Sequence, residues 1–576
     1  MTAASTPPPS FSARSHDPHR VNGAWFRWLV RPPASFGGLV GALLFFWISL
    51  TPSLLPRAWL FQGIVSGLSA VIGFGVGSAV AGIGRRMRPG ATAPTPALRR
   101  RVRIVTVVVA VVGTVVLLWQ AQRWQNELRS LMGVGHAATF FELGVVLLAV
   151  FVASVGLLVA RLVRSFTRFV IRQVDRVAPR AVSVPVGLVL AIVLVAGFVQ
   201  GVVGRGLVRV LNDASAGANH GTNEGSRRPS SAERSGGPGS LVSWSSLGRE
   251  GRAFVGEGPT LAELQAFHGP KCCHAPIRAY VGVQSPGSVE DHARLAVREL
   301  DRTGAFDRAV VGVFVATGNG WINPKVADAL EYLYGGDTAE VSLQYSYLPS
   351  AVSFLVDQQK AGDAAKALVD TVLARVATLP PGHRPKVLLY GESLGSYGIE
   401  RAFGNINALR ARVDGALLVG PTFANPIWDH LVAHREHGSP QWLPKLASSA
   451  GVYFAGAPAD LTGVADAAAQ PHVVYLQNAS DPVTWWNLRL AYRKPAWAGS
   501  PAAPDRAPGF RWFPVVTFLQ ATADLANSLG VPAGHGHYFG SNVVDGWIAV
   551  AKPAQWTANE TARLRALVVP LDESPG

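Results

Sequence analysis

Residues 386–403 read KVLLYGESLGSYGIERAF, and their pattern is the clearest indication of the fold of the C-terminal half of the chain. The apolar run KVLLY is typical of a buried strand, and LGSYGIERAF is typical of a helix. Between them lies the G-x-S-x-G pentapeptide GESLG, residues 391–395. In this strand-turn-helix setting the motif predicts a sharp turn that presents Ser393 at the end of a sheet, because glycines avoid the clashes of larger side chains. Ser393 is the candidate nucleophile, and the backbone N–H of Leu394 at the helix start is a candidate oxyanion donor.

A serine hydroxyl is a weak nucleophile and needs a histidine base that is oriented by an acid. In folds with this motif the chain order is Ser, then Asp or Glu, then His. Asp481 is the preferred acid, because it closely follows the strand-like run HVVYLQ at 472–477. Four other aspartates lack this setting, namely Asp460, Asp466, Asp505 and Asp524.

The loop VPAGHGHYFG at 531–540 supplies two candidate bases, His535 and His537. Glycines beside each histidine let such a loop approach the serine closely. We prefer His537, because a histidine followed by an aromatic residue and a short helix suits a base held by packing. His535 remains the alternative.

A second oxyanion donor is expected from the loop that follows the strand-like run at 308–316. This loop reads TGNGW from Thr317 to Trp321, and its small residues expose backbone N–H groups, so Thr317 and Gly318 are the candidate donors. A phosphate-binding loop would need a lysine and a serine or threonine directly after its glycines, and Lys325 comes too late for that. The candidates for an apolar substrate pocket are Trp321, Trp485 and Trp486.

Strand-like and helical runs alternate from about residue 260 onward, which predicts a mostly parallel sheet flanked by helices. The expected strands are 308–316, 339–348, 386–391, 414–420 and 472–477, and the expected helices are 289–303, 325–334, 350–378, 394–411 and 514–529. We assign 256–576 to this catalytic domain, with an insertion or lid near 421–470. That insertion holds Asp429, His430, His434 and His437, for which a solvated loop is favoured over a metal site. Neither a metal nor a cofactor is predicted.

The N-terminal part of the chain is dominated by apolar stretches at 37–55, 60–84, 102–120, 142–163 and 183–204. Each approaches the ~20 residues that span a bilayer, which predicts a bundle of about five transmembrane helices over 36–205. Glycines within it, at Gly67, Gly73, Gly77 and Gly82, are expected at contacts between helices. Residues 1–35 form a basic tail.

Charge is distributed very unevenly along the chain. Residues 1–211 carry 22 arginines and four acids, a net charge of +18, whereas the remainder carries 30 bases and 32 acids, a net charge of −2. The arginines concentrate in the tail and in the second and fourth connections between apolar stretches, which places the N-terminus in the cytoplasm and the catalytic domain outside. A nucleic-acid partner is not expected, because such a protein would carry its bases on a folded domain. A transporter is disfavoured by the scarcity of acids within the apolar stretches.

Residues 206–255 are rich in Ser, Gly and Arg and predict a low-complexity linker with no core of its own. A fragment that begins near residue 255 is accordingly expected to be soluble. The two cysteines, Cys272 and Cys273, are adjacent, and buried thiols are favoured over a vicinal disulfide.

Taken together, these motifs resemble the membrane-bound α/β-hydrolase family of high-GC bacteria. The resemblance rests on RTGAFDR (302–308), ATGNGWINP (316–324), QYSYLPS (344–350), GESLG (391–395), SDPVTWW (480–486) and VPAGHGHYFG (531–540). It implies an N-terminal helical membrane domain, a C-terminal α/β-hydrolase fold, and esterase- or lipase-like chemistry on a cell-envelope substrate.

The expected protein is a membrane-anchored serine hydrolase that acts on ester bonds of a lipid or acylated envelope substrate through an acyl-serine intermediate. An acyltransferase with the same three residues is one alternative, and a non-enzymatic envelope protein on a hydrolase scaffold is another. The sequence leaves the exact substrate and the oligomeric state open.

Overall fold

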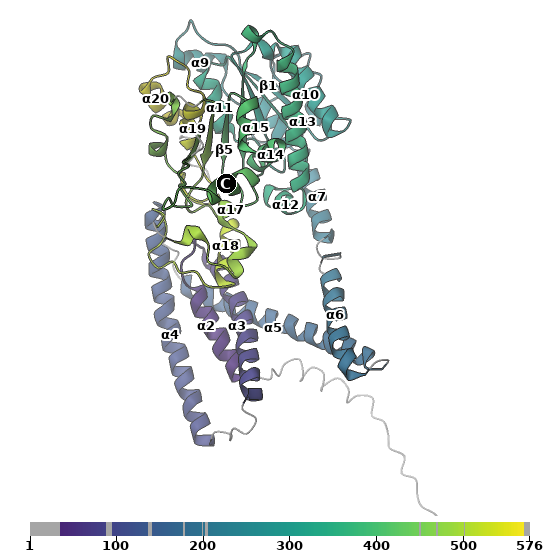
Figure 1. Cartoon of the computed structure of the whole chain (residues 1–576), viewed down its shortest axis with the longest axis vertical. Coiled ribbons are helices and arrows are strands. Elements are labelled where there is room, and N and C mark those ends of the chain that lie inside the picture. Colours follow the sequence, from purple (N-terminus) through teal and green to yellow (C-terminus); the bar gives the residue numbers. More distant parts are fainter. Residues whose placement is uncertain are drawn as a thin grey trace, which may run out of the picture.

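The computed structural model describes residues 35–87, 95–135, 141–176, 179–198, 200–201, 205–447, 451–467, 470–499 and 502–568. Residues 1–34 of the expected N-terminal tail lie outside the described residues. Figure 1 shows two parts, a sheet domain flanked by helices and a set of long helices below it. The sheet domain carries the candidate catalytic residues.

The sheet has seven parallel strands in the order β1-β3-β2-β4-β5-β7-β6. Their bounds are β1 Ile277–Val281, β2 Val310–Val315, β3 Thr338–Leu343, β4 Lys386–Glu392, β5 Gly415–Val419, β6 Val452–Ala455 and β7 His472–Leu476. The five predicted strands are confirmed as β2, β3, β4, β5 and β7. Nearly every strand residue is buried, as expected for a parallel sheet covered on both faces. The C-terminal half therefore has the predicted α/β architecture.

Two groups of helices cover the sheet (Figure 1). One consists of α10 (Val289–Thr303), α13 (Gln358–Ala377) and α14 (Leu394–Phe403), and the other of α11 (Pro324–Leu333), α19 (Asn542–Ala551) and α20 (Ala558–Val568). α10 shows why the sequence folds locally as predicted: Ser288 and Asp291 form a capping box at its start, and Gly304 ends it in a left-handed conformation. Shorter helices are α8 (Gly248–Gly256), α9 (Leu261–His268), α12 (Ser350–Val356), α15 (Ile406–Arg412), α16 (Pro426–Ala433), α17 (Pro482–Trp485) and α18 (Val516–Leu525).

The predicted insertion near 421–470 is not wholly outside the sheet. It contains β6, which pairs with β7 as an edge strand of the main sheet. β6 has only four residues, VYFA, so its sequence carries too little pattern to be recognised. The part of this segment that stays outside the sheet includes α16.

The described residues of the N-terminal part form six helices: α2 (Phe36–Ser49), α3 (Trp59–Met87), α4 (Pro96–Leu131), α5 (Phe141–Val174), α6 (Arg180–Phe198) and α7 (Arg205–Asn219). Among the described residues, three of these, α3, α4 and α5, are long and apolar enough to cross a membrane by length and composition. The other two expected spans, α2 and the apolar part of α6, are shorter in the described residues, so the number of about five spans stays a prediction. The outer faces of α4 and α5 expose many apolar side chains, for example Val111, Val115, Leu147 and Phe151.

Glycines bring α2 and α3 into backbone contact. A Cβ atom on Gly41 would lie 2.2 Å from the carbonyl oxygen of Gly73, and one on Gly77 would lie 2.1 Å from that of Gly37. Gly67 meets α5 instead, where its Cβ would lie 2.6 Å from Cβ of Val152. The three glycines Gly67, Gly73 and Gly77 thus lie at the helix contacts predicted for them.

The helical part is docked on the sheet domain through α18 and the turn at 50–58. The Asp524 carboxylate accepts hydrogen bonds from the N–H groups of Leu54 and Leu55, at 3.1 and 3.4 Å, and pairs with Arg57 at 3.7 Å. The Gln520 amide donates to the carbonyl oxygens of Ser49 and Thr51, at 3.1 and 2.8 Å. Four apolar residues of this helical end, Leu54, Leu55, Leu128 and Met132, belong to the same buried core as the sheet. The two parts therefore share one core.

The expected linker at 206–255 is ordered against the sheet domain. Ser235 donates through its hydroxyl to Glu299 at 2.9 Å, and its N–H donates to the carbonyl oxygen of Arg278 at 3.0 Å. Leu247 and Phe254 enter the main core. The polar composition of this segment predicted a flexible linker. The prediction failed because the residues that hold the segment in place, such as Glu299 and Arg278, are distant in the sequence. The described residues around Ser235, Leu247 and Phe254 therefore pack as part of the sheet domain.

Cys272 and Cys273 are half-buried and joined as a vicinal disulfide, which corrects the expectation of two buried thiols. They precede β1 and lie close to Gly335, whose Cβ would be 3.5 Å from the sulfur of Cys273. This loop is at the opposite end of the strands from Ser393.

Candidate active site

Ser393 occupies a strained turn between β4 and α14. Its backbone has φ 53° and ψ −116°, a conformation that non-glycine residues rarely adopt. The turn is tight on both sides: a Cβ on Gly395 would lie 2.2 Å from the carbonyl oxygen of Val315, and one on Gly391 would lie 2.5 Å from the backbone of Gly395. A residue larger than glycine would therefore clash with the backbone at either position of the motif. The turn places Ser393, which is half-buried, at the carboxyl end of the central strand.

His537 and Asp481 form a buried pair. Nδ1 of His537 lies 2.7 Å from the carboxylate of Asp481, and the two residues are 7 % and 0 % exposed. The other ring nitrogen of His537, Nε2, is buried and has no hydrogen-bond partner among the described residues. An imidazole held in this way has one nitrogen committed to the acid and the other free to exchange a proton.

The His537 ring lies beside the turn that carries Ser393. The N–H of Ser393 donates to the carbonyl oxygen of Val419 at 2.9 Å. The next residue, Gly420, touches the imidazole, because a Cβ there would lie 2.4 Å from Cε1 of His537. The end of β5 therefore connects the turn of Ser393 to His537.

Burial lowers the pKa of His537, whereas the charge and the hydrogen bond of the Asp481 carboxylate and the charge of Glu392 together raise it by more. The net result is a pKa above the ordinary value of 6.5. Asp481 is itself oriented by hydrogen bonds from the N–H of Val483 at 2.8 Å and the hydroxyl of Thr484 at 3.0 Å.

His535 pairs with a different acid. Its Nδ1 lies 3.1 Å from the carboxylate of Asp505, one of the aspartates considered from the sequence. Asp524 faces Arg57 at the helical part, and Asp460 accepts from the N–H groups of Gly456 and Ala457. Asp466 pairs with Lys552 on the surface. Of the five aspartates, the structure brings only Asp481 to His537.

The loop that carries His537 is clamped by residues just before Asp481. The Asn478 amide donates to the carbonyl oxygens of Gly536 and Tyr538, at 2.9 and 3.2 Å, and the Ser480 hydroxyl accepts from the N–H of Gly536 at 3.1 Å. The N–H of His537 donates to the carbonyl oxygen of Ser528 at 2.7 Å. These bonds fix the imidazole through its backbone. The residues Asn478 and Ser480 were missed in the sequence, although they stand in the same stretch as Asp481.

The three candidate oxyanion donors differ in availability. Leu394 is the first residue of α14, in the turn where helix N–H groups lack acceptors within the helix. The loop after β2 does lie beside the turn, because Val315 pairs with Gly391 in register. Within it, however, the N–H of Thr317 donates to the carbonyl oxygen of Trp321 at 3.1 Å, so this donor is already used. Gly318 packs against α12, with its Cβ position 2.5 Å from Cβ of Ser353.

The three tryptophans proposed for a substrate pocket lie in different settings. Trp485 is 1 % exposed, donates to the carbonyl oxygen of Asn478 at 3.2 Å and packs on Trp428, so it belongs to the core and not to a pocket. The sequence could not distinguish it from its neighbour Trp486, which is partly exposed and contacts Phe423. Trp321 is half-buried at the end of the loop after β2.

A polar group next to the turn was not anticipated. The Glu392 carboxylate, at the second position of GESLG, accepts from the Asn323 amide at 3.0 Å and from the Tyr390 hydroxyl. Lys325 donates to the Tyr538 hydroxyl at 2.6 Å. Burial lowers the pKa of Lys325 to about 8, against the opposing effect of Glu392. An acid inside the G-x-S-x-G motif was the signal that could have revealed this group.

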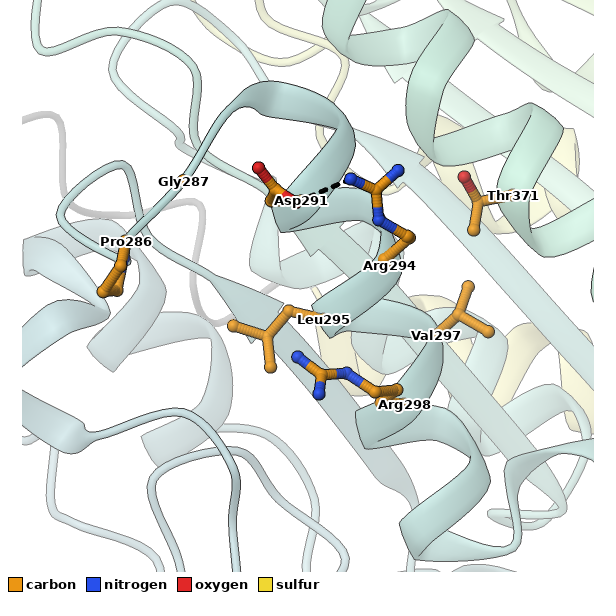
Figure 2. A pocket seen from close by; sticks show the side chains of 8 residues that line it. All are labelled: Pro286, Gly287, Asp291, Arg294, Leu295, Val297, Arg298 and Thr371. Carbon is orange, nitrogen blue, oxygen red and sulfur yellow. Dashed lines mark hydrogen bonds and ion pairs between the residues drawn. The ribbon is translucent and has the colours of Figure 1, made fainter.

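Two other features of the described residues lie apart from these groups. No group of three or more His, Cys, Asp or Glu side chains gathers there in a way that could hold a metal ion. Figure 2 shows a hollow beside α10 and α13, where Asp291 and Arg294 pair with each other at 2.6 Å. None of the candidate catalytic residues lines it.

Two family models match the chain. One, described as the alpha/beta-hydrolase family, covers residues 277–564, and the other, described as the N-terminus of the alpha/beta-hydrolase family, covers residues 50–259. No curated protein and no solved structure matches the chain. The family supports a hydrolase-type function, which agrees with the strand-turn-helix motif and the parallel sheet. The chain belongs to the alpha/beta-hydrolase family.

Proposed function

We propose that this protein is a membrane-anchored serine hydrolase that cleaves carboxylic esters through an acyl-enzyme on Ser393. The observation that carries the proposal is the buried pair of His537 and Asp481 at 2.7 Å, with the free Nε2 beside the strained turn of Ser393. Such a constellation activates a serine hydroxyl.

In the proposed reaction the Ser393 hydroxyl attacks the ester carbonyl carbon while Nε2 of His537 takes its proton. The negative charge that develops on the carbonyl oxygen is stabilised by the N–H of Leu394. Collapse of this intermediate breaks the ester bond, and His537 returns the proton to the departing alcohol. Water then attacks the acyl-serine with the same proton transfers, which releases the carboxylic acid and restores Ser393. Asp481 stays ionised and stabilises the imidazolium.

The test is labelling of the full-length protein with a fluorophosphonate, together with hydrolysis of p-nitrophenyl acetate. Ser393→Ala and His537→Ala should abolish labelling and lower hydrolysis by about 10⁴-fold or more. Two matched variants are the controls, since His535→Ala and Asp505→Asn alter the neighbouring histidine–aspartate pair and should retain both activities. If His535→Ala abolished labelling and His537→Ala did not, the assignment of the base would be wrong.

Membrane anchoring is part of the proposal and is supported by α3, α4 and α5, with their length and apolar exposed faces. The catalytic domain docks on the turn at 50–58, whereas Arg85, Arg86 and Arg99 stand at the other end of these helices. Because arginine-rich connections stay in the cytoplasm, we place the catalytic domain on the outer side, where its ester substrates would be lipids or acylated molecules of the cell envelope.

A further inference from the structure

Four aromatic rings form a continuous row at the carboxyl edge of the sheet. Phe354 of α12 contacts Phe423, with ring centroids 5.2 Å apart; Phe423 contacts Trp486 at 5.2 Å, and Trp486 contacts Phe518 of α18 at 5.6 Å. All four are only partly buried. They differ in this from Trp485 and Trp428, which are enclosed in the core nearby.

One end of the row lies beside the nucleophile turn. Phe354 follows Ser353, which packs on Gly318 in the loop after β2. Phe423 stands in the loop 422–425, and the Asn425 amide of that loop donates to the hydroxyl of Ser396 at 3.2 Å, one helical turn beyond Ser393. The row therefore starts between the two loops that flank Ser393.

The other end of the row reaches the helical part. The Trp486 indole donates to the Thr522 hydroxyl of α18 at 2.8 Å, and Phe518 stands on the same helix. α18 is also the helix whose Gln520 and Asp524 bond to the turn after α2. Figure 1 shows α18 between the sheet domain and the helices α2 and α3.

Exposed apolar side chains accompany the row at this level. Leu488 and Tyr492, on the segment that packs against α18, are 67 % and 70 % exposed, and Leu529, just past α18, is 61 % exposed. Their segment is continuous with the helical part, because a Cβ on Gly509 would lie 2.4 Å from the indole nitrogen of Trp124 in α4. Apolar residues at such positions suit a bilayer surface.

We propose that this row is the binding track for the acyl chain of a membrane lipid, which enters from the bilayer side and presents its ester to Ser393. The inference rests on the proposed function and adds the substrate class and the direction of entry. A short soluble ester would use only the end of the track near Ser393, whereas a long acyl chain would lie along all four rings and extend toward α18. Partly exposed aromatic rings in contact offer the apolar surface that such a chain requires.

The experiment compares p-nitrophenyl palmitate with p-nitrophenyl acetate on the full-length protein in nanodiscs. Phe518→Ala, at the far end of the track, should lower the palmitate-to-acetate ratio of kcat/KM by about tenfold or more, since loss of apolar contacts in a substrate pocket has effects of this order. Phe518→Leu, which keeps much of the side-chain volume, should restore most of the ratio. Tyr453→Ala removes a partly buried aromatic on the edge strand β6 and should leave the ratio unchanged.

Each outcome decides between the two proposals. If Phe518→Ala left the palmitate-to-acetate ratio of kcat/KM unchanged, with or without an equal loss for both esters, the binding track would be wrong. Ser393-dependent hydrolysis of the acetate ester would still support the proposed function. If neither ester is hydrolysed in a Ser393-dependent manner, the proposed function fails and the track fails with it. Fluorophosphonate labelling of each variant reports whether the nucleophile turn is still folded.

Discussion

The two ring nitrogens of His537 have different surroundings. Nδ1 is held by Asp481, and Nε2 is buried next to the end of β5, without a partner in the part of the chain that the structure describes. The histidine two residues earlier, His535, has its own acid in Asp505 and is more exposed. One loop thus carries two histidines that pair with two different acids, and the more buried of them is the candidate base.

The pH dependence of ester hydrolysis should report this environment. A general base must be neutral, so kcat/KM should rise with pH through the pKa of His537, which lies above 6.5 because Asp481 and Glu392 together outweigh the effect of burial. In Asp481→Asn burial remains and the charge is gone, so the remaining activity should titrate at a lower pH. Asp505→Asn is the control and should leave the inflection in place. The same inflection in wild type and Asp481→Asn would contradict the assignment.

At this scale the sequence indicates candidate residues but not all of their contacts. Ser393 was evident because its turn is encoded by adjacent glycines. The choice between His535 and His537 was open, because both follow a glycine and their acids are distant in the sequence. Thr317 was proposed as a donor from composition, but its N–H is consumed by a bond within its own loop.

At the scale of elements, α2 and α3 depend on glycine for their contact. The closest backbone approach involves Gly37, Gly41, Gly73 and Gly77, each of which would place a Cβ within 3 Å of the other helix. Helices without large side chains at the contact can pack through their backbones, as is common inside membranes.

Gly77→Ala and Gly75→Ala test this packing within one helix. A Cβ on Gly77 would lie 2.1 Å from the Gly37 carbonyl oxygen, whereas one on Gly75 meets nothing within 4 Å. Gly77→Ala should destabilise the protein by about 1–3 kcal/mol through overpacking. Gly75→Ala should be neutral or slightly stabilising, because alanine is the better helix former. Thermal unfolding in detergent measures both, and equal midpoints would disprove the close packing of α2 on α3.

The sequence predicted most strands and helices, and the exceptions have physical causes. β1 was missed because the buried Arg278 interrupts its apolar run, and this charge is accommodated by Glu331 at 2.7 Å and Asp328 at 2.6 Å. The helix expected at 350–378 is divided into α12 and α13, since the backbone at Asp357 leaves the helical region. Gly82 was expected at a helix contact, but a Cβ there would meet only the end of the Arg85 side chain, at 4.0 Å.

At the scale of the whole molecule, the helical part and the catalytic domain are held together by buried polar bonds. Arg57 and Asp524 are both fully buried, one in the turn after α2 and the other in α18. Asn527 adds a bond to the carbonyl oxygen of Pro56 at 3.1 Å. A fragment that begins near residue 255 would lose these bonds and part of the core around Leu247, so the expectation that it is soluble is not supported by the structure.

Asp524→Ala should destabilise the full-length protein by about 3–5 kcal/mol, because it leaves the buried charge of Arg57 without a partner. The double variant Arg57→Met, Asp524→Leu removes both charges and should recover much of this loss. Chemical unfolding of the full chain in detergent gives the free energies. If the single variant were as stable as wild type, the pair would not hold the two parts together.

The proposed topology is tested by labelling intact cells after Cys272 and Cys273 are replaced by serine. A cysteine at the exposed Ser230 should react with a membrane-impermeant maleimide, whereas one at the exposed Ala97, next to Arg99, should react only after lysis. The reason is that translocating the arginine-rich connection is unfavourable. Labelling of Ala97→Cys before lysis would place Ser393 in the cytoplasm.

In the proposed membrane-anchored protein, the junction at α18 would also determine the distance between Ser393 and the bilayer. Because α18 is bonded to the backbone at the end of α2, the catalytic domain would rise, sink or tilt with the helices as they adjust to a thicker or thinner membrane. The rate at which the proposed enzyme hydrolyses a membrane lipid would then depend on the thickness of the membrane. In nanodiscs made from lipids of different chain length, hydrolysis of a bilayer-embedded ester should pass through an optimum, while hydrolysis of a soluble ester should stay level. A level response for both would show that the domain moves independently of its helices.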